Sequence, residues 1–360
     1  MTHPLRDGEG FKLGVFSTNA DGGLAITTVP ERWRASWQDN VAAAQMAEAG
    51  GLDFFLPIAR WRGFGGVTKA REHSFETLTW AAAISAITQR MAIFATVHVP
   101  LVHPLYAAKA LATVDHVSGG RAGLNIVCGW NPAEFAMFGT APDDRGYDRA
   151  REWLSIIEQV YASEEPIDFE GEYYSLKGAV SRPASVQVPR PLTMNAAFGD
   201  PGRTFAAQNC DMLFSTFTDL EDGARHVADI KGRADAAGRS VGIYTVCHVV
   251  MGKTMEEAEA AYRRYAFEEA DHEAVSAHMA GKRQFSKSHD EAAYERYAMR
   301  FAGGAGSYPL VGTPEHIAEE IGRIAAQGYG GAALTFLNYT NELPDFCNTV
   351  LPLLSEANLR

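Results

Sequence analysis

Short apolar runs with a strand-like composition alternate with longer amphipathic stretches through almost the whole chain. Helical patterns lie at about 34–50, 76–89, 104–117, 148–162, 201–208, 221–237, 254–269 and 314–327. The eight strand-like runs are FKLGVFS (11–17), LDFFLPIA (52–59), MAIFATVHV (91–99), RAGLNIVCGW (121–130), PLTMNAAF (191–198), DMLFSTF (211–217), VGIYTVCHVV (241–250) and GGAALTFLNY (330–339). The runs are apolar on both faces, as parallel strands covered by helices are. Eight strand–helix units predict an α/β fold, a closed (β/α)8 TIM barrel. A doubly wound open sheet is the alternative, because alternation alone does not require closure.

One barrel domain accounts for residues 1–360, since barrels routinely reach this length as a single unit. Two insertions interrupt the repeat. Residues from about 164 to 183 are too strand-like for a helix and predict a surface hairpin that turns near Glu170 and Gly171. Residues from about 271 to 311 are charged, carry His272, His278 and His289, and end in FAGGAGSYP. This composition predicts a mobile lid, and a solvated excursion without function is the alternative.

The composition excludes several classes of protein. Hydrophobic residues make up 46% and charged residues 21%, which is typical of a globular protein. No apolar run approaches the roughly 20 residues that cross a bilayer, and the N-terminus lacks the apolar core of a signal peptide. A formal net charge of −12 argues against binding to nucleic acid or to anionic membranes. We therefore expect a cytoplasmic enzyme.

Polar side chains interrupt two strands near their carboxyl ends, where barrels carry their active sites. Asn125 lies inside an apolar strand, and a buried amide is costly unless it is hydrogen-bonded, either to a neighbouring strand or to a ligand. Trp130 and Glu134 follow just beyond the end of that strand. Thr96 and His98 share one face of the preceding strand. The alternative for Thr96 is a structural role, because threonine is common in strands. A lone histidine such as His98 is more often a hydrogen-bonded structural residue than a catalytic one.

Two loops could bind an anionic or planar group. The stretch ARWRGFGG (59–66) contains two arginines and a tryptophan that could bind such a group by charge and stacking. The alternative is that the arginines are only solvated charges on a loop. In NAAFGDPGRTFAAQ (195–208), glycines precede a helix start with Asp200 as a possible cap and Pro201 at the first helical position. Such a helix N-terminus suits a phosphate, although any tight turn can use G-x-x-G.

Other chemistries lack their sequence signatures. The four cysteines lie far apart without a C-x-x-C, and the spacing of His98 and His103 matches no standard zinc site, so we expect no metal. No G-x-S-x-G nucleophile elbow is present. No G-x-G-x-x-G follows a strand, so tight binding of a dinucleotide is not indicated.

Three stretches resemble the luciferase-like family of flavin-dependent monooxygenases, and the resemblance covers nearly the whole chain. HPLYAAKALATVDHVSGGRAGLNIVCGW (103–130) resembles that family's His-Pro, a helix ending in Asp, Ser-x-Gly-Arg, and a strand entering Gly-Trp. GDPGRTFAA (199–207) resembles its phosphate-binding turn, and LVGTPEHIAEEIGRI (310–324) resembles the start of its last long helix. RWRGFGG, IFATV and GLNIVCGWNPAEF are most similar to the pyrimidine monooxygenase subgroup, which opens the uracil ring.

The resemblance implies a (β/α)8 barrel that uses reduced, exchangeable FMN and O2, with NADH consumed by a separate NADH-dependent flavin reductase. It also implies a homodimer or homotetramer. The implied catalytic residues are Thr96 and Asn125. The implied FMN contacts are Ala59, Arg60, Asn125, Glu134, Gly146, Tyr147 and Gly199. The implied oxygen pocket consists of Leu56, Thr96 and Asn125, and we expect Trp61, His98 and Trp130 to complete the substrate side of the same pocket.

Several positions depart from the subgroup. Gly146 replaces an arginine and Gly199 replaces a phosphate-binding serine, so only backbone contacts persist there. Trp61, Val97, His98 and His103 also differ from the pyrimidine enzyme's pocket. We therefore expect a two-component FMN monooxygenase that oxygenates, and opens or dehalogenates, a small ring such as an N-heterocycle or cyclic amide. A deazaflavin-dependent oxidoreductase and a catalytically silent flavin-binding protein are the alternatives.

Overall fold

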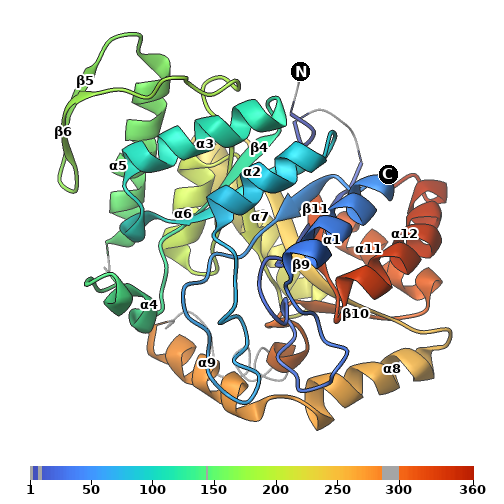
Figure 1. The fold of residues 1–360 in the computed structure, drawn as a ribbon. Coiled ribbons are helices and arrows are strands. Elements are labelled where there is room, and N and C mark those ends of the chain that lie inside the picture. Colours follow the sequence, from blue (N-terminus) through green and yellow to red (C-terminus); the bar gives the residue numbers. More distant parts are fainter. Residues whose placement is uncertain (1–2, 7–9, 143–144, 286–299) are drawn as a thin grey trace.

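The computed structural model describes residues 3–6, 10–142, 145–285 and 300–360, with the side chains of 282–285 excepted. Eight parallel strands of this part of the chain close into a barrel (Figure 1). Closure occurs because β9 pairs with β8 on one side and with β11 on the other. In ring order the strands are β1 (Lys12–Phe16), β2 (Phe54–Leu56), β3 (Ala92–His98), β4 (Ala122–Val127), β7 (Leu192–Ala196), β8 (Met212–Ser215), β9 (Gly242–Met251) and β11 (Gly331–Thr335). The predicted (β/α)8 barrel is confirmed, and the open-sheet alternative is wrong.

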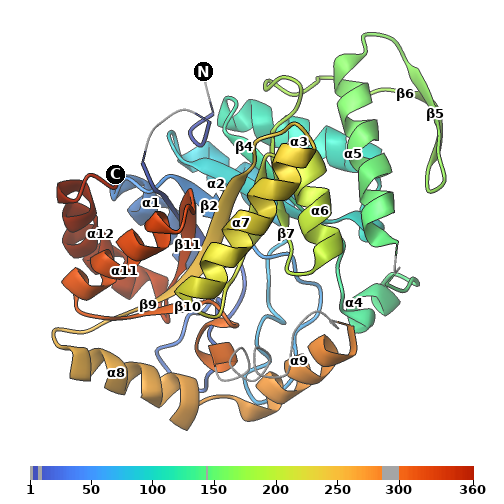
Figure 2. The ribbon, with the colours of Figure 1, turned by 180° about the vertical axis from the view of Figure 1, so that it is seen from behind.

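Helices cover the outside of the barrel, as Figure 2 shows from the opposite side. Each predicted helical pattern corresponds to one of them, but the pattern at 254–269 forms α8 (Met255–Arg263) followed by a π-helical turn, η2 (Arg264–Glu268). The others are α1 (Trp37–Ala49), α2 (Thr77–Ile87), α3 (Pro104–Ser118), α5 (Gly146–Ala162), α6 (Asp200–Asn209), α7 (Leu220–Ala236) and α11 (Pro314–Ala326). Elements absent from the sequence prediction are η1 (Val99–Leu101), α4 (Pro132–Met137), α9 (His272–Phe285), β10 (Tyr308–Gly312) and α12 (Tyr339–Glu356).

Strand alternation sorts the side chains into two cores. Phe54, Leu56 and Phe94 pack in the barrel interior, whereas their neighbours Phe55 and Ile93 pack outward against the helices. The interior is filled so tightly that a Cβ at position 123, in β4, would lie 2.5 Å from the Phe94 ring. By the same alternation, Thr96 and His98 in β3 continue the interior face toward the carboxyl end of the barrel.

The segment 164–183 contains a two-stranded antiparallel hairpin, β5 (Ile167–Glu170) and β6 (Ser175–Ala179). It projects from the barrel beside α5 (Figure 1). The Glu152 carboxylate of α5 accepts hydrogen bonds from the backbone N–H groups of Glu172 and Tyr173, at 2.7 and 2.9 Å. These bonds fasten the hairpin tip to the helix.

Apolar side chains of the described part of segment 271–311 are buried. This part contains α9 and β10, and Ala274, Met279 and Phe301 are buried against Ile26 and Ala70. Both ribbon views place α8 and α9 at one end of the barrel and the N-terminus at the other (Figures 1 and 2). His289 and the rest of 286–299 lie outside the described residues. Within the described chain, no helix combines the length and apolarity that crossing a membrane requires.

Candidate active site

Thr96 and Asn125 meet at the carboxyl ends of two neighbouring strands. They are register partners of β3 and β4, and both are buried, with 5% and 3% of their surface exposed. The Asn125 Nδ2 donates a hydrogen bond to Thr96 Oγ1 at 3.2 Å, and Thr96 Oγ1 donates to the Pro57 carbonyl at 2.6 Å. Asn125 Oδ1 has no partner among the described residues. The amide therefore retains a buried acceptor that a ligand could use.

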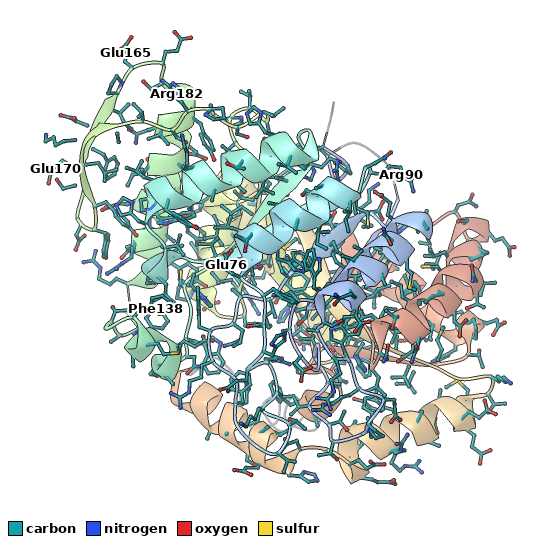
Figure 3. All side chains as sticks on the ribbon, viewed as in Figure 1. Glu76, Arg90, Phe138, Glu165, Glu170 and Arg182 are labelled. Carbon is teal, nitrogen blue, oxygen red and sulfur yellow. The ribbon has the colours of Figure 1, made fainter. Side chains whose placement is uncertain are left out.

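A pocket of about 90 Å³ opens beside Thr96. The residues that line it come from the ends of β2 and β3, from the turn before α3, and from the start of α2, where Figure 3 labels Glu76. Five of the predicted site residues share it, because the ends of adjacent parallel strands lie side by side. These are Ala59, Arg60, Trp61, Thr96 and His98; the other lining residues are Ser74, Phe75, Glu76, Thr77, Val97 and Val102.

Glu134 of α4 holds the loop after β2 in place. It lies near the N-terminus of α4, is 1% exposed, and its Oε2 is 3.1 Å from Arg60 Nη1. Its Oε1 accepts hydrogen bonds from the backbone N–H groups of Trp61 and Arg62, at 2.8 and 3.2 Å. The charge of Arg60 is thereby balanced inside the protein, although Arg60 Nε has no partner among the described residues.

Aromatic rings cover this loop on the side of α9. The Arg60 guanidinium carbon lies 5.0 Å from the ring centre of Phe64 and 5.9 Å from that of Trp130. The His278 ring of α9 packs edge-on against both aromatic rings, with centroid distances of 4.2 and 5.0 Å. A Cβ at Gly281 would lie 3.3 Å from Trp130, so α9 lies directly against this cover. Trp61, by contrast, is 39% exposed and packs edge-on against Phe138.

His98 is a neutral imidazole at the pocket wall. Burial lowers its pKa to about 4, with Glu134 opposing that shift and Arg60 adding to it. Its Nδ1 has no partner among the described residues, and only 7% of the residue is exposed. His103, the other histidine of this region, accepts the backbone N–H of Leu105 at the start of α3 and does not line the pocket.

Gly146, Tyr147 and Gly199 form a second group, at the starts of α5 and α6. Gly199 is the N-cap of α6 and no side chain caps that helix, so backbone N–H groups remain at its first turn. The Tyr147 hydroxyl occupies the space that a Cβ at Gly202 would fill, 2.4 Å away. Burial raises the pKa of Tyr147, which keeps its hydroxyl protonated as a donor.

Leu56 faces the barrel interior with Phe54, as predicted from strand parity. The sequence analysis missed the wall made by residues 74–77. A usable signal was present, because a helix that begins shortly after a barrel strand places its first residues at the active-site end. No cluster of three or more histidine, cysteine or acidic residues suited to a metal occurs in the described parts of the chain.

The residues present fit a flavin such as FMN. Asn125 Oδ1 and Arg60 Nε are buried polar atoms without partners, at the carboxyl ends of the strands. The uncapped N-terminus of α6 suits a phosphate. The pocket of about 90 Å³ is smaller than the ~300–1,000 Å³ of typical cofactor sites. This pocket alone is therefore too small for a whole flavin.

Comparisons with known proteins agree with this geometry. Residues 11–330 match the family described as luciferase-like monooxygenase. The pyrimidine monooxygenase RutA of Escherichia coli O139:H28 is 30% identical over 365 residues, which cover 98% of this chain and 92% of that protein. The riboflavin lyase RcaE and the long-chain alkane monooxygenase LadA have similar structures, with TM-scores of 0.86 and 0.85 at 22% and 21% identity. Each covers 98% of this chain, which covers 92% and 93% of theirs.

Proposed function

The chain belongs to the luciferase-like monooxygenase family and is a flavin-dependent monooxygenase, and from that premise we propose that it is the oxygenase of a two-component system. It takes reduced FMN from a separate NADH-dependent flavin reductase. With O2 it oxygenates, and opens or dehalogenates, a small ring such as an N-heterocycle or cyclic amide. The relatives named pyrimidine monooxygenase support a ring substrate. A homodimer or homotetramer in the cytoplasm belongs to the same proposal.

The observation that carries the proposal is the Thr96–Asn125 pair. Reduced flavin, when bound, supplies the electrons that let O2 react with a closed-shell organic molecule. Asn125 Oδ1 and the small Thr96 side chain offer a polar, buried corner beside the pocket, and Leu56 faces the barrel interior. We assign these three residues to the oxygen site and keep Thr96 and Asn125 as the catalytic residues.

The remaining site residues bind and orient. Ala59, Arg60 and Glu134 are assigned to the flavin ring, because Glu134 holds the 60–62 backbone in place and leaves Arg60 Nε unpartnered. Gly146, Tyr147 and Gly199 are assigned to the phosphate end, where the α6 N-terminus favours an anion. Trp61, His98 and Trp130 are assigned to the substrate. Segment 271–311 is assigned as a lid that excludes water, because α9 covers Phe64 and Trp130.

The deciding experiment mixes the protein with FMN that has been reduced anaerobically, then adds ¹⁸O2 and a panel of uracil, pyridine, pyridone and chlorinated aromatic compounds. Mass spectrometry should find one labelled oxygen atom in a product, above the background of free reduced FMN. Asn125→Ala serves as the matched protein control and should give only that background. Absence of labelled product with every ring contradicts the proposal, and binding of a deazaflavin in place of FMN would support the alternative oxidoreductase.

A further inference from the structure

The pocket beside Thr96 is electrically balanced or slightly negative. Of the described residues that line it, Arg60 is the only one with a permanent positive charge, and Glu134 neutralises it at 3.1 Å. Glu76 brings a negative charge to the rim, where it caps α2 by accepting hydrogen bonds from the Leu78 and Thr79 N–H groups. An anionic compound entering this pocket therefore meets a carboxylate and no free cation.

The hydroxyl groups on the walls are already committed as donors. Ser74 Oγ donates to the Arg60 carbonyl at 2.8 Å, and Thr77 Oγ1 donates to the Thr96 carbonyl at 2.5 Å. Thr96 Oγ1 donates to the Pro57 carbonyl. Two buried polar atoms of the wall residues lack partners among the described residues, Arg60 Nε and His98 Nδ1. Arg60 Nε belongs to the flavin in the proposed function, so His98 remains for the substrate.

His98 is placed where a substrate must react. It lies two residues after Thr96 on the same face of β3, so a ring in contact with the imidazole also lies beside the proposed oxygen site. A Cβ added at Gly129 would lie 3.2 Å from the Cδ2 atom of His98. Nδ1 is on the opposite edge of the imidazole ring, so it faces away from Gly129. A buried ring nitrogen without a partner costs free energy that a bound ligand would recover. The lowered pKa of His98 keeps the imidazole uncharged at neutral pH.

The pocket also limits the size of its ligand. A cavity of about 150 Å³ holds one benzene molecule, and this pocket measures about 90 Å³. A single small ring therefore fits only if the Trp61 side chain at the pocket edge moves, and a larger ligand does not fit.

We propose that this pocket binds a single small uncharged ring whose N–H or C=O group hydrogen-bonds His98, and that it rejects carboxylated rings. The inference rests on the proposed function for the choice of which wall faces the flavin. A lactam ring carries both a donor and an acceptor, so it satisfies His98 in either neutral tautomer. His98 is thereby a substrate-recognition residue, and Glu76 is a residue that excludes anions.

The test uses 2-pyridone, 2-pyridone-6-carboxylate and benzene as probes, with affinities measured by calorimetry on the full-length protein saturated with FMN. The wild type should bind 2-pyridone at least about tenfold more tightly than its carboxylate, the size of one hydrogen bond or one unfavourable charge. His98→Leu and His98→Asn are nearly equal in size, but only asparagine keeps a polar atom close to the position of Nδ1. His98→Leu should weaken 2-pyridone binding by about tenfold and leave benzene unchanged, and His98→Asn should restore most of the loss.

Glu76→Gln separates charge from size, because it removes the charge and keeps an oxygen that can cap α2. It should improve binding of the carboxylate and leave 2-pyridone unchanged. The inference is overturned if the carboxylate binds the wild type as tightly as 2-pyridone, if Glu76→Gln leaves carboxylate binding unchanged, if His98→Leu leaves 2-pyridone affinity unchanged, or if 2-pyridone does not bind. If the protein prefers 2-pyridone but no ¹⁸O enters any product, the proposed oxygenase function is refuted and the assignment of His98 and Glu76 to the pocket stands.

Discussion

The Asn125 side chain donates to the Thr96 hydroxyl at 3.2 Å and leaves its own carbonyl oxygen buried without a partner in the described structure. A buried asparagine usually satisfies both ends of its amide. Asn40 does so, because its Nδ2 donates to the Ser36 carbonyl at 2.9 Å and its Oδ1 accepts the Trp80 indole N–H at 3.0 Å. The half-satisfied amide of Asn125 favours a ligand-binding role over a role in strand stability.

Asn125→Ala should abolish oxygenated product while the free energy of unfolding stays within about 1–2 kcal/mol of the wild type. The reason is that its one protein hydrogen bond is modest, whereas the unsatisfied oxygen is the feature assigned to the reaction. Product yield by mass spectrometry and urea unfolding measure the two effects. Asn40→Ala is the matched control and should show the reverse, with lost stability and retained activity. An active but unstable Asn125→Ala protein would make this residue structural.

Thr96 should matter by its size as well as by its hydroxyl. Thr96→Leu adds bulk to a buried corner beside Pro57, so it should stop oxygenation or divert reduced FMN to hydrogen peroxide while FMN still binds. Thr96→Val keeps the size, removes the bonds to Pro57 and Asn125, and should give an intermediate loss. The ratio of product to NADH consumed reports on this coupling. A wild-type ratio in Thr96→Leu would rule out the oxygen-site assignment.

Glu134 should stabilise the loop that is assigned to the flavin ring. Glu134→Ala leaves Arg60 buried without its counterion and two backbone N–H groups without an acceptor, so it should cost about 3–5 kcal/mol of stability and weaken FMN binding. In the double variant Arg60→Met, Glu134→Leu, stability should recover in part, because no charge is left buried although the Trp61 and Arg62 N–H groups still lack their acceptor. FMN affinity, measured by fluorescence quenching, should stay low. Recovery of FMN affinity as well would show that Arg60 and Glu134 do not serve the flavin.

The barrel could be predicted from the sequence because its strand-like runs are apolar on both faces, and each of the first seven is followed by a helical pattern. Three omissions have physical causes. The pattern of α12 was obscured by Pro344 and Pro352, which the helix tolerates although proline removes a backbone donor. Helix α4 is six residues long, too short to show a helical period. Helix α9 buries its apolar residues against loops, so its surroundings, and not its own pattern, decide its structure.

The sequence could place the site residues at strand ends but could not pair them. That Thr96 and Asn125 are neighbours follows from the register of β3 and β4, which strand boundaries alone do not determine. The bonds from Glu134 to the 61 and 62 amides depend on the position of α4, an element that was not predicted. The pocket wall at 74–77 depends on how the loop after β2 returns to α2, and loop paths carry little periodic signal.

His248 should make stability depend on pH. Its Nδ1 and Nε2 lie 2.8 Å from Thr335 Oγ1 and 2.6 Å from the Tyr265 hydroxyl, and burial lowers its pKa to about 3. Below pH 6.5, the ordinary pKa of histidine, His248 is protonated in the unfolded chain but stays neutral in the folded protein. The free energy of unfolding that depends on this group therefore falls as the pH falls from 6.5 toward 3. The buried carboxyl of Glu342, whose pKa is raised to about 7, has the opposite dependence.

A comparison of wild type with His248→Gln isolates the effect, because Glu342 and the other buried histidines are common to both proteins. The stability difference should shrink by up to about 1.4 kcal/mol for each pH unit below 6.5. Urea unfolding at pH 7, 6 and 5 measures it. A difference that is the same at all three values would mean that His248 titrates normally in the folded protein.

Helix α9 should open for flavin exchange and close during the reaction. Polar and aromatic contacts join it to the loops after β2 and β4: Asp271 accepts hydrogen bonds from the N–H and hydroxyl of Thr68, both at 2.7 Å, and His278 packs on Phe64 and Trp130. Hydrogen exchange should be fast in α9 of the free protein and much slower with FMN and substrate, while β3 and β4 stay protected throughout. Asp271→Ala removes the Thr68 bonds, so it should speed FMN release and raise the share of reduced FMN lost as peroxide, because water reaches the flavin. Equal protection of α9 in both states, together with wild-type coupling in Asp271→Ala, would make this segment a fixed part of the barrel wall and leave flavin exchange to another route.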